Sequence, residues 1–373
     1  MESLCRVRMN WDNFRHNVRL LQREGKTLMP VIKADAYGHG AIRAAAELSG
    51  LGIDWVATGT LQEGAAVRES GFQGCIVALL GLNFDTGALR VARGKNVAPL
   101  IHNWEGLRFA ASQNTEDAPM NIALKVDTGM GRLGFPLSDM ETVSAFLTEH
   151  PTLSPLALLS HFSVADEPEE DAYTRRQAEI FSRAADILRR RFPDMRCSLG
   201  HTAGLLCHAE ISGDLCRPGL SLYGYNPLFG TTREEKGRGL LPVMEVSAPL
   251  LSVHPLHAGE SLGYGRAYIA PDERMVGWVG IGYADGYRRS PSPQTCMCVN
   301  GERVPVLGRV AMQMTCIDLT ALSTAGRLPA PGDDVYVLGG PGNAVSAQDL
   351  AGWWNTIPYE VTCLLGKNRL NRP

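Results

Sequence analysis

Short apolar runs alternate with helical patterns over residues 27–224. Each run has the length of a strand. In the segments between them, apolar residues recur at helical spacing, for example over 41–48, 64–70, 104–111 and 169–191. Eight strand-and-helix units in series favour a closed parallel barrel over an open sheet. The predicted strands are 28–33, 55–59, 75–80, 97–101, 121–126, 156–160, 196–199 and 215–217.

The pattern changes after residue 227. Residues 230–239 are rich in glycine, threonine and charge, which predicts a connection. Beyond it come strand-like runs separated by turn residues such as Asn300-Gly301, and one helix over 347–354 with Ser346 as its N-cap. The predicted strands of this part are 243–253, 275–281, 295–299, 303–310 and 335–338.

These patterns predict an α/β chain of two domains. Residues 1–230 form a (β/α)8 barrel of the TIM type, and residues 231–373 form a mostly β domain. Residues 3–9 alternate as a strand does, so residues 1–10 are a candidate strand of the second domain.

Charge and composition exclude several classes of protein. The net charge of the 373 residues is only −3, so no strong field points to nucleic acid or to a membrane surface. No run of eighteen apolar residues occurs, and the N-terminus lacks a signal-peptide core. The nine cysteines show no metal spacing, and strand alternation explains Cys296 and Cys298 better than a zinc site does. We expect reduced thiols in a cytoplasmic protein without a metal.

The first predicted strand ends at Lys33, before a turn loosened by Gly38 and Gly40. A lysine held between apolar residues and a tight turn is partly desolvated, which lowers its pKa. Its neutral amine can attack an aldehyde and form a Schiff base. For a lone lysine, the common alternative is a side chain that ends a strand by reaching into water.

Further candidate residues follow the predicted strands of the barrel, the first strand included. Each alone has an ordinary explanation as a core or surface residue, but barrels place catalytic groups at the C-terminal ends of their strands. Their joint placement therefore favours one site. These residues are Tyr37, Lys125, Arg132, His161, His201, Thr202, Arg217, Gly219 and Leu220.

The ten residues from Val31 to Gly40, VIKADAYGHG, resemble the pyridoxal-phosphate (PLP) attachment motif of the alanine racemase family. The segment 124–134, LKVDTGMGRLG, is similar to the family's second block, and the resemblance extends over nearly the whole chain. It implies a PLP-dependent enzyme of fold-type III, with the cofactor carried on Lys33. The activity implied is an isomerase that interconverts L- and D-alanine and supplies D-alanine for peptidoglycan.

PLP also needs a phosphate cradle, a contact for its ring face and a partner for its ring nitrogen. The backbone of Gly219 and Leu220 can supply the cradle, together with hydroxyls of Tyr37, Thr202 and Tyr359. His161 is the candidate for the ring face, and Arg217 is the candidate for the nitrogen. Because arginine only donates hydrogen bonds, it favours an unprotonated nitrogen and a weaker electron sink. That suits racemisation over transamination.

The resemblance implies roles for six further residues. Arg132 would meet the substrate carboxylate and the cofactor's phenolic oxygen, and a carbamate on Lys125 would orient it. Tyr264, in Gly263-Tyr264-Gly265, would be the second base. Lys33 would exchange the proton of the D-substrate and Tyr264 that of the L-substrate, on an external aldimine. Each base reaches only one face, so two are needed. The backbone N–H of Met312 would meet the substrate carboxylate, Tyr283 would line the site entrance, and Asp285 would support structure there.

In the family the tyrosine base comes from the partner subunit, which implies a head-to-tail homodimer with shared active sites. Three positions depart from the family pattern: Gln313 replaces a usual aspartate, Ala311 a frequent cysteine and His201 a usual asparagine. Gln313 removes a negative charge, so we expect effects on rate and selectivity rather than on the reaction.

Three alternatives remain at this stage. A broader-specificity amino-acid racemase shares the scaffold, but such relatives are typically exported. A PLP-binding barrel protein without racemase activity would lack the second domain and its tyrosine. A PLP decarboxylase of the same layout would place an acidic residue at the ring nitrogen, where this chain has Arg217.

Overall fold

The computed structural model describes residues 3–23, 25–82, 85–113, 119–289 and 294–371. The chain divides into two compact units. The barrel unit comprises Asp12–Ala36 and Gly40–Leu241, and the β unit comprises Met1–Trp11, Tyr37–His39 and Pro242–Pro373. The division in the second half of the chain falls after Leu241, whereas the sequence placed it after residue 230.

The barrel unit is built on eight parallel strands. Six of them form a continuous sheet in the order β3-β4-β5-β6-β7-β8, and β2 pairs with β9. Two links close the ring: Ile32 N donates to Ala57 O (2.8 Å), and Arg217 N donates to Gly200 O (2.8 Å). The predicted parallel barrel is confirmed. The strands are β2 (Thr27–Leu28), β3 (Trp55–Thr58), β4 (Cys75–Ala78), β5 (Val97–Ile101), β6 (Met120–Lys125), β7 (Leu153–Leu159), β8 (Arg196–Ser198) and β9 (Leu215–Cys216).

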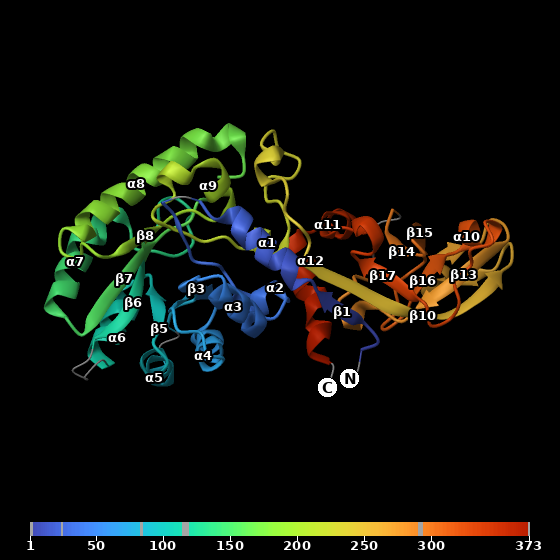
Figure 1. The fold of residues 1–373 in the computed structure, drawn as a ribbon, viewed down its shortest axis with the longest axis horizontal. Coiled ribbons are helices and arrows are strands. Elements are labelled where there is room, and N and C mark those ends of the chain that lie inside the picture. The colour runs from blue at the N-terminus through green and yellow to red at the C-terminus, as the bar shows by residue number, and fades with distance from the viewer. Residues whose placement is uncertain (1–2, 24, 83–84, 114–118, 290–293, 372–373) are drawn as a thin grey trace. The chain divides into compact units, whose positions relative to one another are not determined.

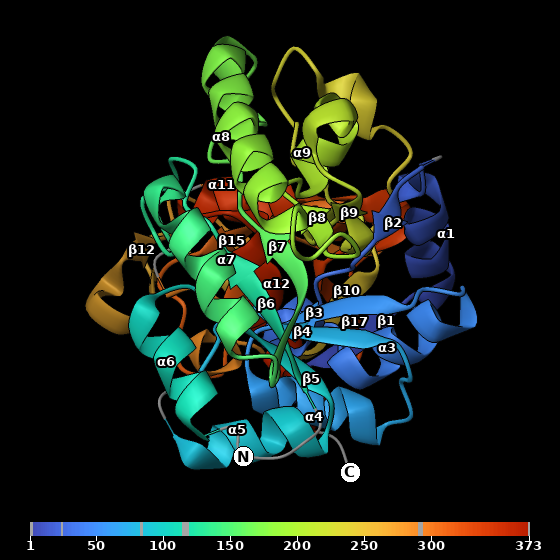
Figure 2. The same ribbon diagram turned by 90° about the vertical axis from the view of Figure 1, so that its left-hand side faces the viewer.

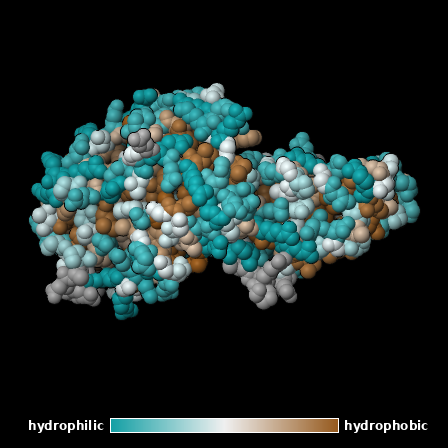
Figure 3. Space-filling view, in the orientation of Figure 1, coloured by the Kyte–Doolittle hydropathy of each residue, from teal (hydrophilic) through white to brown (hydrophobic). Residues whose placement is uncertain are grey.

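Helices follow these strands and lie outside them (Figure 2). The longest, α8 (Asp171–Arg189), buries one face that includes Phe181 and Leu188. Its other residues are mostly charged, and hydrophilic surface covers this helix in Figure 3. The remaining helices of the unit are α1 (Trp11–Leu21, with Trp11 in the β unit), α3 (Ala41–Gly50), α4 (Leu61–Glu69), α5 (Thr86–Gly94), α6 (Trp104–Gln113), α7 (Met140–Glu149) and α9 (Thr202–Cys207).

The β unit is a closed antiparallel barrel (Figure 1). Its strands follow the order β10-β13-β16-β15-β14-β17, and β17 returns to pair with β10. The N-terminal strand β1 (Arg6–Met9) joins the edge of β10, with Val7 opposite Val246. The other strands are β10 (Met244–Leu256), β11 (Ser261–Leu262), β12 (Tyr268–Ile269), β13 (Arg274–Val279), β14 (Cys296–Val299), β15 (Glu302–Leu307), β16 (Thr315–Asp318) and β17 (Asp334–Leu338).

Helices of the β unit are α10 (Thr320–Thr324), α11 (Ala347–Trp354) and α12 (Pro358–Gly366). Ser346 caps α11 as the sequence predicted: its hydroxyl accepts from Asp349 N, and the Asp349 carboxylate accepts from Ser346 N. No helix in the described part of the chain is both long enough and apolar enough to cross a bilayer.

Two predicted strands end three or more residues early. The run over 28–33 is a strand only at Thr27–Leu28, and α2 (Lys33–Tyr37) follows with a left-handed backbone. The run over 303–310 ends at Leu307, because Gly308 turns the chain with φ 65°. The sequence prediction omitted β16 and α12. Both are short, and neither has a marked polar-apolar pattern.

Candidate active site

Several predicted residues of the barrel unit stand directly at the C-terminal ends of its strands. Lys125 is the last residue of β6, His161 follows β7 by two residues, and Arg217 follows β9 directly. His201 and Arg217 are opposite each other in a parallel bridge. The barrel therefore gathers these side chains at one end, as its topology requires.

Arg217 is held by neutral groups alone. Arg217 is only 5% exposed, and its guanidinium donates to the carbonyls of Ser160 and Ser198 and to the Ser198 hydroxyl. Burial lowers the pKa of Arg217 to about 10. Among the described residues, no carboxylate forms an ion pair with it. The guanidinium thus remains a charged donor. A PLP decarboxylase would need an acidic residue at this position, and this chain has Arg217 there.

Lys125 is buried beside two arginines. Burial, the Arg217 charge and the Arg132 charge together lower the pKa of its amine to about 7. Lys125 is 7% exposed, and no carboxylate of the described chain forms an ion pair with it. An amine in this setting is partly neutral near pH 7 and therefore nucleophilic.

The imidazoles of His161 and His201 lie against each other, with ring centroids 4.9 Å apart. Burial and neighbouring positive charge hold the pKa of His161 well below its usual range, and burial lowers the pKa of His201 to about 4. Both rings are therefore neutral at pH 7. Arg217 Nη2 is 3.4 Å from His161 Nδ1, and Ala203 N donates to His201 Nδ1 (3.1 Å). Each Nδ1 is thus an acceptor, which leaves the proton on Nε2.

Asp127 folds the loop that carries Arg132. Its carboxylate accepts hydrogen bonds from the backbone N–H groups of Gly129, Met130 and Gly131, at 2.9–3.2 Å. The loop closes where Asp127 N donates to the carbonyl of Phe135 (2.9 Å). Arg132 is exposed on this loop, yet it is near enough for its charge to act on Lys125.

We expect Asp127→Asn to loosen this loop. An asparagine has one acceptor oxygen, so its amide would face at least one backbone N–H that the carboxylate now accepts. The expected loss is about 1–2 kcal/mol in the free energy of unfolding, with about tenfold faster hydrogen exchange over residues 128–133. Urea unfolding and exchange mass spectrometry measure both. Asp85→Asn is the matched control, because among the described residues the Asp85 carboxylate accepts from one backbone N–H, that of Gly87. Equal effects of the two substitutions would contradict the role of Asp127.

Residues predicted to form a phosphate cradle lie between β9 and the connection, and on α9. Gly219 N donates to Thr202 Oγ1 (3.2 Å), and Thr202 begins α9. Thr202 and Leu220 are buried. A hydroxyl and backbone N–H groups therefore lie together beside Arg217, in a set that suits an anion.

Lys33 begins the left-handed segment. Ala34, Asp35, Ala36 and Tyr37 have φ values of 52–55°. For residues with a side chain, this conformation costs about 1–2 kcal/mol each. Lys33 is exposed, which corrects the expectation that the strand end desolvates it. The structure thus gives Lys33 an exposed side chain next to a backbone of defined conformation.

The predicted residues of the β unit fall into separate groups. Tyr37 and Tyr359 are neighbours, with ring centroids 5.7 Å apart, and burial raises the pKa of Tyr37. Tyr264 lies in the β11–β12 hairpin and is 66% exposed. The glycines beside it, Gly263 and Gly265, have φ values of 58° and 70°. A side chain on Gly265 would lie 3.0 Å from Arg309 Nη1, so that guanidinium packs on the tyrosine turn.

Met312 and Tyr283 belong to two loops that support each other. Tyr283 N donates to Ala311 O (3.1 Å), and Ala284 N donates to Met312 O (2.9 Å). Asp285 holds the turn, because its carboxylate accepts from Gly282 N (3.0 Å) and from the Ser3 hydroxyl (2.7 Å). Met312, Gln313 and Tyr283 are exposed. These groups are available to an external partner or ligand.

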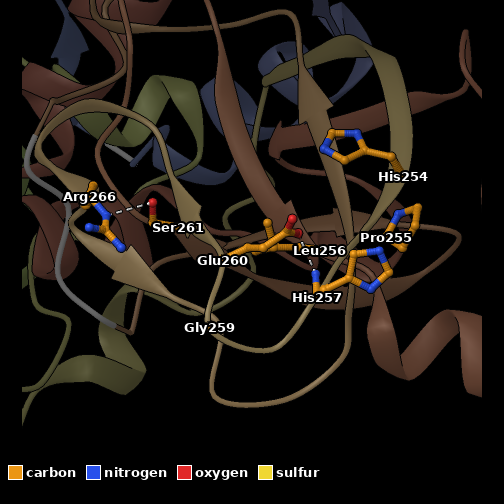
Figure 4. A pocket seen from close by; sticks show the side chains of 8 residues that line it. All are labelled: His254, Pro255, Leu256, His257, Gly259, Glu260, Ser261 and Arg266. Atoms are coloured by element: carbon orange, nitrogen blue, oxygen red, sulfur yellow. Dashed lines mark hydrogen bonds between the residues drawn. The ribbon is translucent and has the colours of Figure 1, made fainter.

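An open groove lies elsewhere in the β unit, beside the hairpin that carries Tyr264 (Figure 4). His254, His257, Glu260 and Arg266 line it among others. None of the predicted site residues lines this groove. It is therefore not a candidate for the cofactor.

Sequence reasoning missed the residues that support the site. Gln177, buried in α8, donates to His161 O (3.1 Å) and accepts from Ser163 N (3.0 Å). Glu63, in α4, accepts from Ala34 N (2.9 Å). Asp127 lies in the segment 124–134, which the sequence analysis singled out. Its hydrogen bonds to residues 129–131 depend on the folded path of the loop. For Glu63, the S/T-x-x-E capping signature Thr60–Glu63 was the one available signal.

Comparison with known proteins identifies the family. Residues 9–227 match the family described as "Alanine racemase, N-terminal domain", and residues 243–372 match "Alanine racemase, C-terminal domain". The alanine racemase of Nitratidesulfovibrio vulgaris is 44% identical over 362 residues, which cover 97% of this chain and 96% of that protein.

Solved structures agree with this. The biosynthetic alanine racemase of Pseudomonas aeruginosa has a TM-score of 0.86 and 32% identity, and the match covers 98% of this chain and 97% of that one. The alanine racemase of Bartonella henselae with covalently bound pyridoxal phosphate has a TM-score of 0.86, at 24% identity and 98% coverage of both chains. This chain belongs to the alanine racemase family.

Proposed function

We propose that this protein is a PLP-dependent alanine racemase that interconverts L- and D-alanine. The observation that carries the proposal is the environment of Arg217 at the strand ends of the barrel. This buried arginine donates to neutral groups and has no carboxylate partner among the described residues. Family membership supplies the reaction, and the donor set fits it.

The residues present fit PLP. Thr202, Gly219 and Leu220 would hold its phosphate, with Tyr37 and Tyr359 adding hydroxyls. Arg217 would donate to the ring nitrogen, and neutral His161 would lie against the ring. Lys33 would bind the aldehyde carbon through its amine. When bound, PLP holds the amino acid by its nitrogen and makes the Cα–H bond acidic.

The chain's own residues then bind the substrate and move the proton. Arg132 would bind the alanine carboxylate, helped by Met312 N–H. Lys33 Nζ would exchange the Cα proton on one face, and Tyr264 Oη would do so on the other. The stereocentre inverts because the two bases reach opposite faces.

A homodimer with shared sites accounts for the exposed face of the β unit. Tyr264, Tyr283, Met312 and Met314 are large side chains that stay 41–66% exposed. Such residues are typical of an interface. In a head-to-tail dimer, the partner subunit's Tyr264 would complete the site at each barrel.

We place the protein in the cytoplasm, supplying D-alanine for peptidoglycan. All nine cysteines are free in the structure, which suits a reducing compartment. Chiral chromatography of purified holoenzyme with each of several L-amino acids tests the function. D-alanine as the main product is expected. Comparable racemisation of larger amino acids would favour the broader-specificity racemase, and no racemisation would refute the proposal.

We expect Lys125 to carry a carbamate. The neutral amine attacks CO₂, forms an N–C bond and releases one proton, which yields an anion between Arg132 and Arg217. Because the amine protonates below its pKa of about 7, the adduct should form at pH 8 and be lost at pH 6. In CO₂-depleted buffer, activity should fall about tenfold to a hundredfold through misplacement of Arg132.

Carbon-13 NMR with labelled bicarbonate measures the adduct directly. The Lys125→Ala variant is the control that should lack the signal. A signal of equal size in both proteins would place the carbamate on another amine. Full activity without CO₂ would show that Lys125 acts as a plain amine.

A further inference from the structure

The Lys33 segment takes a conformation that its own sequence does not favour. Ala34, Asp35 and Ala36 have φ near 53° and ψ near 49°, and none is glycine. Strained backbone of this kind persists only where the surrounding structure imposes it. Contacts around the segment must therefore hold it.

Two of these contacts are local to the segment's ends. Ala36 N donates to Ile32 O (2.9 Å), and Gly40 N donates to Asp35 O (2.8 Å). The Asp35 carboxylate also accepts from Ala41 N (2.8 Å) at the start of α3. These bonds tie the segment to the chain before and after it. None of them fixes its position relative to the rest of the barrel.

Glu63 makes a lateral contact. Its Oε1 accepts from Ala34 N (2.9 Å), the residue directly after Lys33. Its Oε2 accepts from Gly59 N (2.7 Å) and Thr60 N (3.1 Å) in the loop after β3. One carboxylate thus joins the chain after Lys33 to the C-terminal end of the neighbouring strand.

The packing at Gly59 shows how close this junction is. A side chain on Gly59 would lie 2.7 Å from Glu63 Oε2 and 3.4 Å from Lys33 Cβ. A side chain at this position would therefore displace the Glu63 carboxylate, which lies against the β3 loop together with the lysine stem. Hydrogen bonds to an ionised acceptor are stronger than neutral ones, so the carboxylate is suited to hold a strained turn.

We propose that Glu63 is a positioning residue for Lys33: its carboxylate holds Ala34 N–H against the β3–α4 loop and so fixes the left-handed turn that directs the lysine. The assignment rests on the proposed function, because it takes Lys33 to be the amine that carries PLP. Glu63 itself touches neither substrate nor cofactor in this proposal.

Glu63→Gln is the test variant. The amide keeps the shape but has one acceptor oxygen, so it cannot accept both at Ala34 and at the β3–α4 loop. Thr60→Ala is the matched control. It removes the helix cap, in which Thr60 Oγ1 accepts from Glu63 N (3.1 Å), and leaves the carboxylate bonds in place.

The readout is where PLP attaches, independent of turnover. Each protein is incubated with substoichiometric PLP and reduced with borohydride, and pyridoxyl-labelled lysines are then quantified by peptide mass spectrometry. We expect labelling at Lys33, relative to other lysines, to fall about tenfold in Glu63→Gln, the size of one lost charge-assisted hydrogen bond. Thr60→Ala should label Lys33 as the unaltered protein does.

A second variant tests the mechanism by rescue. Glycine adopts positive φ without strain, so Ala34→Gly introduced into Glu63→Gln should restore most of the Lys33 labelling. Normal labelling in Glu63→Gln, an equal loss in Thr60→Ala, or no rescue by Ala34→Gly would each overturn the assignment. Absence of Lys33 labelling in the unaltered protein would instead overturn the proposed function.

If Glu63→Gln does not fold, Glu63→Asp keeps the charge but shortens the reach by one methylene. Lys33 labelling about tenfold lower in folded Glu63→Asp supports positioning, because the shorter carboxylate cannot span both segments. Unchanged labelling in that variant refutes it.

Discussion

Replacing Lys33 by alanine is expected to lower racemase activity by at least about 10⁴-fold, because it removes both the cofactor's attachment amine and one of the two bases. The absorption band of lysine-linked PLP should also disappear. Ultraviolet–visible spectra and a polarimetric assay measure the two effects. The expectation depends on the position of Lys33 after the first barrel strand, at the start of the left-handed segment.

Lys95→Ala is the control for Lys33→Ala. Lys95 is a surface lysine of the same barrel unit, paired with Glu69 at 2.7 Å. Its removal should leave the spectrum and the rate unchanged. If Lys33→Ala kept a band that borohydride abolishes, another lysine would carry the cofactor and the site would have to be reassigned.

Much of the architecture was predictable because the local signals agree with the fold. The strand 97–101 matches β5 in full, since five buried residues stand between Asn96, with φ 48°, and a polar turn. Helix 347–354 also matches α11 in full. Its capping box marks the start, and left-handed Asn355 marks the end. Such consistent local signals need no tertiary information.

The left-handed segment could not be predicted from its own residues. Alanine and aspartate favour right-handed or extended backbone, so local preference indicated a strand running to residue 33. Its support comes from Glu63, which is distant in sequence and adjacent only in the folded barrel. Tertiary contacts therefore override local preference at the residue proposed to carry the cofactor.

The residues of the candidate site were predictable from the sequence, but the hydrogen bonds that hold them in place were not. Lys125, His161 and Arg217 could be predicted as site residues because each stands at the end of a predicted parallel strand. Barrel topology brings those ends together. No sequence signal indicated that Asp127 folds the Arg132 loop or that Gln177 holds the His161 carbonyl. Those bonds join loops whose paths depend on the complete fold.

Tyr264→Phe is expected to slow proton abstraction from L-alanine by about 10²–10⁴-fold and from D-alanine much less. The phenol is the proposed base for one face only, whereas Lys33 serves the other. Exchange of the Cα proton with deuterated water, followed separately for each enantiomer, measures the asymmetry. Tyr268→Phe is the control, because Tyr268 lies in the same hairpin, paired with Leu262, and has no proposed role. Equal losses with both enantiomers would contradict two separate bases.

The same substitution tests whether the active site is shared between subunits. In a mixed dimer of Lys33→Ala and Tyr264→Phe subunits, a head-to-tail arrangement puts both defects in one site and leaves the other intact. Random mixing then restores about a quarter of the unaltered activity, since half of the dimers are mixed and each has one working site. Because Tyr264 is exposed on its own chain, this rescue follows if its phenol serves a neighbouring barrel. Purified mixed dimers without activity would instead mean that each site draws both bases from a single chain.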